Sequence, residues 1–319
     1  MAGRVLLIDH NHDALVAGLT ELGYTCEPGY ELSYQEILDR VNEYKGLVIR
    51  SRITIDQKLL EAAAQLRWIG RVGAGMENID VAFAESKGVA CLNAPEGNRN
   101  AVAEHAIGML LSLFNNLRRA DAEVRHGVWK REANRGLELA GKTVGIIGYG
   151  YMGSWFAQRL ASLGVEVLAH DKYKTLFVPQ EHGAHIRESS LEQLQEEADI
   201  ISLHLPQSEE THHYIDEAFI EKCARPFFLV NTARGKNVDT GALIRGLRSG
   251  KILGACLDVL EYESSSFSNL FDRASVPTDL QALLEEDRVI LSPHVAGWTH
   301  ESHRRLAEVI VEKVAALAL

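Results

Sequence analysis

The sequence predicts an α/β protein with two doubly wound, parallel-sheet lobes. Short β-branched runs alternate with longer segments of helical period, as in βαβ units. This alternation occurs twice in the 319 residues, once on each side of a long apolar-striped helix over 100–116. A glycine-rich fingerprint opens the second series, so that about 140 residues forming an α/β unit of their own precede it.

In the first series, apolar runs predict strands over 4–9, 46–51, 67–72 and 89–93. Between them, apolar residues three and four apart predict helices over 11–22, 33–42 and 55–65. Pro95 and Gly97 are helix-stopping residues that precede the long helix predicted over 100–116. A last amphipathic segment over 301–319 predicts a helix that packs on one of the lobes.

In the second series, strands are expected over 142–147, 166–170, 199–204, 227–231, 254–257 and 289–291. The segment 264–287 interrupts this rhythm. It is rich in Ser, Asn, Asp and Thr, and predicts a loop with a short helix near 279–285. We therefore predict a discontinuous first domain of residues 1–99 and 294–319, a second domain of residues 100–293, and a cleft between them.

The composition excludes several classes of protein. With 33 basic and 44 acidic residues the formal net charge is −11, and no stretch forms the cationic patch that nucleic-acid binding needs. The apolar runs are far shorter than the roughly 18 residues that span a bilayer. The first residues predict a buried strand rather than an export signal, and the four cysteines lack metal-ligand spacing. We predict a cytoplasmic protein with reduced, buried cysteines, no metal site, and no nucleic-acid or membrane partner.

The clearest chemical signature is Gly-Tyr-Gly-Tyr-Met-Gly at 148–153, between a predicted strand and a predicted helix. Gly148 permits a tight turn, Gly150 lets the backbone approach a pyrophosphate, and Gly153 lets the helix pack on the strand. The helix N-terminus offers free N–H groups and a positive dipole end to phosphates. The alternative is a glycine-rich turn in an ordinary α/β domain.

The next strand ends in Asp171, 18 residues after Gly153. Its carboxylate can accept hydrogen bonds from the adenosine-ribose hydroxyls and would repel a 2′-phosphate, so NAD is favoured over NADP. Lys172 and Lys174 weaken this preference, because a nearby cation could tolerate a phosphate.

Three residues at ends of predicted strands have the chemistry that hydride exchange with a 2-oxo acid needs. Arg234 can clamp a carboxylate and polarise a carbonyl, His294 can transfer a proton near neutral pH, and Glu263 can orient that histidine. The alternatives are a salt-bridged arginine, a hydrogen-bonded histidine after a turn proline, and a solvated loop acid. His204 also ends a strand but has no neighbouring acid, and we interpret it as a packing residue.

Eight segments together resemble the D-isomer-specific 2-hydroxyacid dehydrogenase family, which includes phosphoglycerate dehydrogenases and hydroxypyruvate and glyoxylate reductases. They occur in order over nearly the whole chain: RSRITID at 50–56, RVGAGMENID at 71–80, NAPEGNRNAVAEHAIGMLL at 93–111, ELAGKTVGIIGYGYMG at 138–153, LHLPQSEET at 203–211, NTARG at 231–235, LDVLEYE at 257–263 and SPHVAGWT at 292–299. The resemblance implies a Rossmann NAD-binding domain and a flavodoxin-like substrate domain.

The resemblance also implies roles for individual residues. Arg234 would bind the substrate, His294 would be the acid/base and Glu263 its partner. Backbone at Ala74 and Gly75 would hold the substrate carboxylate. The remaining cofactor-binding positions implied for this chain are Tyr151, Met152, Thr211, Thr232, Ala233, Asp258 (to the nicotinamide amide), Ala296 and Gly297.

The implied reaction is hydride exchange between NAD(H) and a D-2-hydroxy acid or its 2-oxo acid. Arg52, in the RSR stretch, is the candidate second anion site and favours 3-phosphoglycerate over hydroxypyruvate or glyoxylate; its alternative is a surface salt bridge. Trp298 departs from the family pattern, and could narrow the pocket, cover the nicotinamide or pack between lobes. The 264–287 segment is longer than in typical members, and could shape substrate access or a dimer contact.

The apolar stripe on 100–116 and the segment 117–136, which contains Trp129, predict a homodimer through the nucleotide domain, as the resemblance suggests. Two rival functions have the same scaffold. One is a non-catalytic NAD-binding protein like the C-terminal-binding corepressors, but no peptide-binding N-terminal extension is recognisable. The other is a formate or phosphite dehydrogenase; Glu263 argues against the former, because formate enzymes of this group carry glutamine there.

Overall fold

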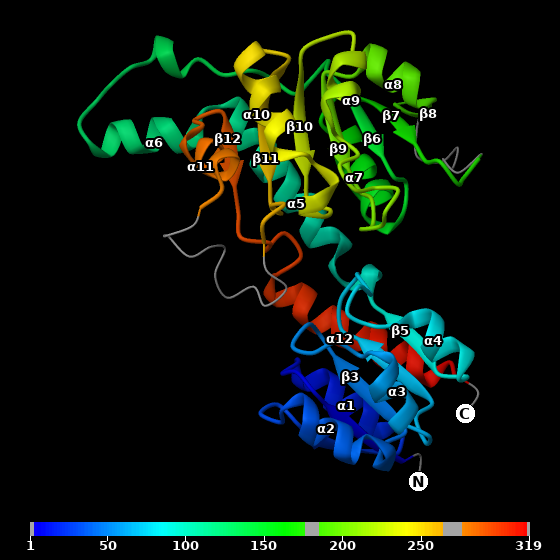
Figure 1. The fold of residues 1–319 in the computed structure, drawn as a ribbon. Helices are drawn as coiled ribbons and strands as arrows, with labels where there is room; N and C mark the ends of the chain where they lie inside the picture. The colour runs from blue at the N-terminus through cyan, green and yellow to red at the C-terminus, as the bar shows by residue number, and fades with distance from the viewer. Residues whose placement is uncertain (1–2, 176–184, 264–275, 318–319) are drawn as a thin grey trace. The chain divides into compact units, whose positions relative to one another are not determined.

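The computed structural model describes residues 3–175, 185–263 and 276–317. The chain forms two compact units, one of Met1–Asn98 with Trp298–Leu319 and the other of Arg99–Gly297. The first contains a five-stranded sheet and the second a seven-stranded sheet (Figure 1). The predicted α/β class with two parallel sheets is confirmed. The cleft expected between the two domains stays a prediction.

The first sheet has the strand order β2-β1-β3-β4-β5, and every neighbouring pair is parallel. This is the flavodoxin-like order, in which the chain winds outward in both directions from the first strand. Its strands are β1 (Gly3–Leu7), β2 (Tyr24–Pro28), β3 (Gly46–Ile49), β4 (Trp68–Arg71) and β5 (Ala90–Asn93).

Both faces of this sheet are covered by helices. Successive residues of β1 point to opposite faces, so Val5 and Leu7 pack in one apolar cluster and Leu6 in another. Helices α1 and α12 contribute to the cluster of Val5, and helices α2, α3 and α4 to that of Leu6. The bounds are α1 (Asp13–Glu21), α2 (Tyr34–Arg40), α3 (Gln57–Ala62), α4 (Val81–Ser86) and α12 (His300–Ala315).

The second sheet has the order β12-β11-β10-β9-β6-β7-β8, again with all neighbours parallel. The order reverses at β6, which lies between β7 and β9. In doubly wound sheets, ligands bind at the carboxyl ends of the strands at such a switch point. The bounds are β6 (Thr143–Ile147), β7 (Glu166–His170), β8 (Ile186–Glu188), β9 (Ile200–Leu203), β10 (Phe227–Asn231), β11 (Ile252–Leu257) and β12 (Val289–Leu291).

Two apolar clusters cover the faces of the second sheet. Val144 and Ile146 of β6 pack with α5 (Pro95–Phe114) and α7, whereas Ile147 packs in a cluster that includes residues of α8 to α11. The other α-helices of this unit are α6 (Leu117–Arg125), α7 (Tyr151–Ala161), α8 (Leu191–Glu197), α9 (Glu217–Lys222), α10 (Thr240–Ser249) and α11 (Thr278–Glu285). Helix α11 is the short helix expected near 279–285.

The long helix α5 begins earlier than predicted, because it runs from Pro95 to Phe114 rather than over 100–116. Proline is well suited to the first position of a helix, where its missing N–H has no intrahelical partner. Gly97 belongs to the same helix, and a Cβ there would lie 2.7 Å from the main-chain nitrogen of Leu306 in α12. This glycine therefore permits close helix packing instead of stopping the helix.

The sequence pattern misses the strands β2 and β8. Both lie at a sheet edge and contain polar residues, so their apolar signal is weak. The predicted domain boundary at 294 also differs from the compact units. Val295 and Ala296 belong to the larger unit, because their N–H groups bind the carboxylate of Asp258.

The four cysteines are free; Cys223 and Cys256 are buried, whereas Cys26 and Cys91 are partly exposed. Within the described part of the chain, no helix combines the length and the apolar character that crossing a membrane requires.

Candidate active site

The glycine loop after β6 has the geometry that its spacing predicts. Gly148 has a φ of +93°, and a Cβ there would lie 2.5 Å from the carbonyl oxygen of His204. A Cβ on Gly153 would lie 2.0 Å from the carbonyl oxygen of Gly148, so this glycine permits the contact of α7 with the turn. A Cβ on Gly150 would meet no described atom within 4 Å. Packing therefore does not require a glycine at 150, and the close approach of a pyrophosphate there stays a prediction.

The surroundings of this loop fit a dinucleotide. Gly150 is the N-cap of α7 and makes no side-chain capping bond, so Tyr151 and Met152 begin the helix at the predicted pyrophosphate position. Thr232 Oγ1, after β10, is buried and makes no hydrogen bond to any described residue. Both β6 and β10 end at the same sheet edge, so this hydroxyl is a candidate donor to the cofactor. Thr211, by contrast, uses its hydroxyl within its own loop, donating to the carbonyl of Pro206 at 2.7 Å.

Asp171 follows β7 beside the glycine loop. Its Oδ2 accepts from the N–H of Tyr149 at 2.9 Å, and its Oδ1 accepts from the N–H of Tyr173 at 3.1 Å. These two bonds fix the carboxylate, which is predicted to bind the adenosine ribose, beside the glycine loop. Lys174 Nζ lies 3.9 Å from Oδ2 and donates to the carbonyl of Tyr149 at 2.8 Å.

Two of the three catalytic candidates are in direct contact. Glu263 Oε2 lies 3.2 Å from Nδ1 of His294, and both side chains are about three-quarters buried, with exposed fractions of 24% and 29%. Because a carboxylate oxygen only accepts, Nδ1 carries the proton in this bond. The other ring nitrogen, Nε2, is then the atom that can exchange a proton with a ligand.

The turn that carries His294 is held by Asp258. His294 has a φ of +55°, a left-handed conformation that is uncommon for residues other than glycine. Its N–H donates to the carbonyl of Asp258 at 2.7 Å, and the buried Asp258 carboxylate accepts from Val295 N at 2.9 Å and Ala296 N at 2.8 Å. Asp258 therefore positions the histidine; its contact with the nicotinamide amide stays a prediction, like those of Ala233, Ala296 and Gly297.

Arg234 lies in the loop after β10, and its Nη1 donates to the carbonyl of Ala233 at 2.6 Å. The buried Asn231 shapes this loop by donating to the Arg234 carbonyl at 2.9 Å. A Cβ on the next residue, Gly235, would lie 2.0 Å from the carbonyl oxygen of Leu260. The arginine loop thus packs on the segment that leads into Glu263.

A residue that the sequence reasoning missed is His105 on α5. Its Nε2 lies 2.8 Å from Ser292 Oγ, which donates to Asp258 Oδ1 at 2.5 Å. Since the serine proton goes to the carboxylate, His105 donates to the serine. The only local sequence signal was a histidine on the partly buried stripe of a helix, which is more often a packing residue.

Two other histidines differ from His294. His204 is held by Ser202, whose Oγ lies 2.9 Å from its Nε2, and burial lowers the pKa of His204 to about 3. This supports its interpretation as a packing residue. His213 binds Glu261 at 2.7 Å, so the two acids of the LEYE segment have different histidine partners.

In the smaller unit, the guanidinium of Arg52 binds three main-chain carbonyls. Its nitrogens donate to Ile8 at 3.0 Å, Leu32 at 2.6 Å and Gly29 at 2.9 Å. These bonds tie together the loops after β1 and β2, so Arg52 has a structural role rather than that of a surface salt bridge. Its assignment to a second anion site loses support from this geometry.

Two further arginines of this unit, Arg50 and Arg71, interact with each other through their charges. Burial and then the charge of Arg71 lower the pKa of Arg50 to about 10. A Cβ on Gly73 would lie 1.3 Å from Nη1 of Arg71, so this guanidinium lies against the loop that contains Ala74 and Gly75. Two cations thus lie near each other beside the predicted carboxylate-binding loop.

Trp298 belongs to the same unit and is 58% exposed. The Arg50 guanidinium carbon lies 3.9 Å from the centre of the Trp298 ring system, and the His303 ring stacks on it with a centroid distance of 5.9 Å.

Of the segment 264–287, for which a loop and a role in substrate access or a dimer contact were predicted, residues 264–275 lie outside the described residues. No group of three His, Cys, Asp or Glu residues in the described ranges could hold a metal ion.

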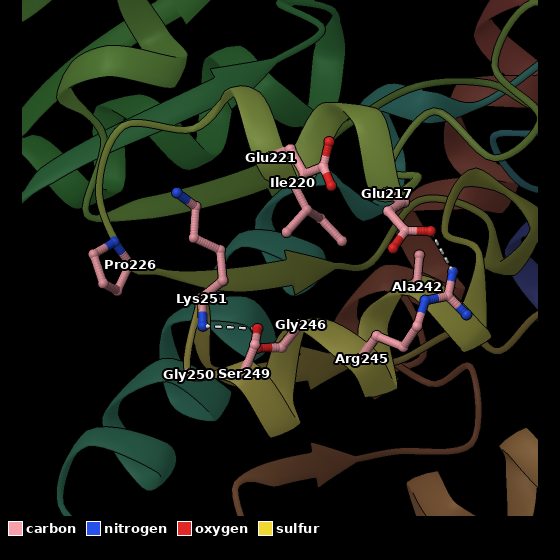
Figure 2. A pocket seen from close by; sticks show the side chains of 10 residues that line it. All are labelled: Glu217, Ile220, Glu221, Pro226, Ala242, Arg245, Gly246, Ser249, Gly250 and Lys251. Atoms are coloured by element: carbon pink, nitrogen blue, oxygen red, sulfur yellow. Dashed lines mark hydrogen bonds and ion pairs between the residues drawn. The ribbon is translucent and has the colours of Figure 1, made fainter.

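A cavity of about 550 Å³ lies between α9 and α10, where Glu217 and Arg245 form an ion pair at 3.1 Å (Figure 2). Its lining includes Pro226, before β10, and Lys251, before β11. The cavity therefore lies at the amino ends of these strands, whereas the glycine loop and His294 lie at the carboxyl ends of the strands of the same sheet.

Comparison with known proteins agrees with this geometry. Residues 107–296 match the family described as "D-isomer specific 2-hydroxyacid dehydrogenase, NAD binding domain". The chain belongs to this family. The cofactor predicted from the glycine loop, NAD, is that of the matched domain, and the larger unit is the NAD-binding domain of this family member.

Relatives of this family member differ in their named substrates. It is 35% identical to a hydroxypyruvate reductase of Thermotoga maritima over 96% of this chain and 94% of that protein. It is 32% identical to a D-3-phosphoglycerate dehydrogenase of Archaeoglobus fulgidus over 99% of this chain, but spans only 57% of that protein. The crystal structure of an Aquifex aeolicus D-lactate dehydrogenase complexed with NAD and lactic acid has a TM-score of 0.81 and 29% identity, and covers 98% of this chain and 94% of its own.

Proposed function

We propose that this protein interconverts a D-2-hydroxy acid and its 2-oxo acid with NAD(H), using Arg234, His294 and Glu263. The observation that carries the proposal is the contact between Glu263 and Nδ1 of His294 in a turn of positive φ that Asp258 holds. A left-handed conformation at a non-glycine residue costs free energy, and such strain is concentrated at functional sites.

Each of these side chains has a defined part in the reducing direction. Arg234 binds the substrate carboxylate and polarises the 2-oxo group. The bound reduced cofactor supplies the hydride that C2 accepts. His294 donates its Nε2 proton to the carbonyl oxygen, while Glu263 holds the ring through Nδ1 and stabilises the charged imidazole. In the oxidising direction His294 accepts the same proton back.

The preferred substrate in this proposal carries a second anionic group, with 3-phosphoglycerate as the best candidate. Support comes from Arg50 and Arg71, because burial and the charge of Arg71 lower the pKa of Arg50 more than the nearby Asp9 raises it, so that a bound anion would stabilise the charged guanidinium. They take the place of Arg52, whose guanidinium binds main-chain carbonyls. The second candidate is hydroxypyruvate or glyoxylate, favoured by the relative that matches along nearly its whole length.

The deciding test is a panel of 2-oxo acids with NADH, containing 3-phosphohydroxypyruvate, hydroxypyruvate and glyoxylate. We expect the highest kcat/KM for the phosphorylated acid. Arg50→Gln should raise the KM for this substrate at least about tenfold, the loss expected when a charged hydrogen-bond partner is removed. It should change the KM for glyoxylate little, and Arg67→Gln, at an arginine away from this pair, should change neither. A higher kcat/KM for hydroxypyruvate, unaffected by Arg50→Gln, would favour the second candidate.

We also propose a homodimer formed through the larger unit. Helix α6 has no buried residue, and this helix and the chain after it stand off the edge of the seven-stranded sheet (Figure 1). Apolar side chains are exposed along this arm: Leu117, Val124, Trp129 and Leu137. An apolar surface of this kind is typical of an interface, and a second copy of the chain is the partner that a symmetric assembly requires.

A further inference from the structure

Two lysines follow Asp171, and a lysine at this position could accept the 2′-phosphate of NADP. In the structure each lysine has another partner. Lys174 donates to the carbonyl of Tyr149 and lies 3.9 Å from Asp171 Oδ2. Lys172 binds Oε1 of Glu210, a residue 38 positions further along the chain.

Glu210, Lys172 and Tyr173 form a closed cluster. The second carboxylate oxygen of Glu210, Oε2, accepts from the hydroxyl of Tyr173. The ammonium of Lys172 also lies 5.4 Å from the centre of the Tyr173 ring, within the range of a cation–π contact. One carboxylate therefore holds both side chains that follow Asp171.

The main chain on both sides of this cluster is fixed. Glu210 precedes Thr211, whose buried hydroxyl binds the Pro206 carbonyl and whose own carbonyl accepts from Asn237 at 3.0 Å. On the other side, the N–H of Tyr173 donates to Asp171 Oδ1. The cluster thus connects the loops after β7 and β9, the two strands that lie on either side of β6 and its glycine loop.

The charges of this cluster oppose a 2′-phosphate. The hydrogen bond from Lys172, and then that from Tyr173, lower the pKa of Glu210, and the bond to Glu210 raises the pKa of Lys172. The pair is therefore fully ionised near neutral pH. Glu210 therefore neutralises the charge of Lys172.

We propose that Glu210 is a cofactor-specificity residue, which favours NAD by holding Lys172 away from the place where a 2′-phosphate would be bound. This rests on the proposed binding of the adenosine ribose at Asp171. Glu210 acts on specificity through Lys172, so the two residues should be energetically coupled in the choice between NADH and NADPH, and not in the choice of 2-oxo acid.

The experiment compares kcat/KM for NADH and NADPH, and the dissociation constants of both nucleotides, in four proteins: wild type, Glu210→Gln, Lys172→Gln and the double variant. Glu210→Gln should raise the NADPH/NADH ratio about threefold or more, a size set by the energies of exposed ion pairs. The double variant should lose this gain, and Lys172→Gln alone should change the ratio less than about twofold. Glu209→Gln is the matched control, because it removes the same charge one residue away and should leave the ratio unchanged.

Two results would overturn the proposal: an unchanged ratio in Glu210→Gln, or a gain that persists in the double variant. Asp171→Ala, measured in parallel, separates this from the proposed cofactor position. If Asp171→Ala leaves the ratio unchanged, the placement of the ribose fails whatever Glu210 does. The nucleotide dissociation constants give the same comparison without catalysis, so a slow variant remains informative.

Discussion

The main-chain N–H of His294 donates to the carbonyl oxygen of Asp258 at 2.7 Å, and the carboxylate of Asp258 binds the next two N–H groups of the same turn. Three hydrogen bonds accepted by one buried residue thus hold the proposed acid/base in a left-handed conformation. Ser292 adds a fourth by donating to the same carboxylate at 2.5 Å, and His105 in turn binds the serine. The position of the imidazole therefore depends on a residue of α5 and on the residues that directly follow β11 and β12.

Ser292→Ala should disturb this support without removing a group that is proposed to touch substrate. Losing a hydrogen bond to a buried carboxylate costs about 1–3 kcal/mol of unfolding free energy. We expect kcat to fall about fivefold to tenfold, since misplacement of a catalytic group lowers the rate more than the binding of substrate. Urea unfolding and steady-state kinetics measure the two effects. Ser162→Ala, at an exposed helix end, is the control, and an unchanged kcat in Ser292→Ala would show that the network does not position His294.

Glu263→Gln should lower kcat by about 10-fold to 100-fold, part of the 10²–10⁴-fold that general acid–base catalysis contributes. A neighbouring carboxylate favours the charged imidazole, and reduction of the 2-oxo acid requires that form. The pH above which reduction slows should therefore be lower in Glu263→Gln, and the acidic limb of the oxidation reaction should move the same way. The measurement is kcat/KM against pH in both directions.

The matched control for this variant is Glu261→Gln, two residues away, because Glu261 pairs with His213 instead of His294. It should leave both limbs in place. If neither limb moves in Glu263→Gln although activity persists, the contact between Glu263 and His294 has no catalytic role.

His204 should make the protein sensitive to acid. Burial holds its pKa at about 3 in the folded state, below the ordinary value of 6.5, so the unfolded state binds more protons between these pH values. Stability from this group is present above pH 6.5 and is lost as the pH falls towards 3, by up to about 1.4 kcal/mol per pH unit. His204→Gln should flatten the fall in unfolding free energy between pH 6.5 and 4.5, measured with urea. Equal slopes in both proteins would contradict the buried neutral histidine.

Trp129→Asp should break the proposed dimer, because Trp129 is 77% exposed on the arm after α6 and an interface does not tolerate an unpaired buried charge. We expect twice the single-chain mass for the wild type at micromolar concentration, and the single-chain mass for the variant, by light scattering. Leu163→Asp introduces the same charge at an exposed leucine outside the arm and should leave the mass unchanged. A wild type of single-chain mass would rule out the dimer.

The sequence by itself determined the features that depend on local spacing. The alternation of apolar runs predicts both sheets, and the glycines at 148, 150 and 153 predict a turn that the structure confirms at Gly148 and Gly153. The contact of Glu263 with His294 was also predicted, from the chemistry of the two side chains and from the family resemblance of two short motifs, which follow the neighbouring parallel strands β11 and β12. These inferences succeed because the information is contained in a few neighbouring residues.

Only the tertiary structure decided the features that depend on distant partners. Pro95 and Gly97 read locally as helix breakers, but they lie in the first turn of α5, where Gly97 permits the close approach of α12. Arg52 has the chemistry of an anion site, yet its guanidinium binds three carbonyls from two other segments, the loops after β1 and β2. His105 and Ser292 are 187 residues apart and Lys172 and Glu210 are 38 apart, so no local pattern contains either contact. A charged or polar side chain takes its role from the partner that folding brings to it, and that partner is fixed by the packing of the sheets and helices.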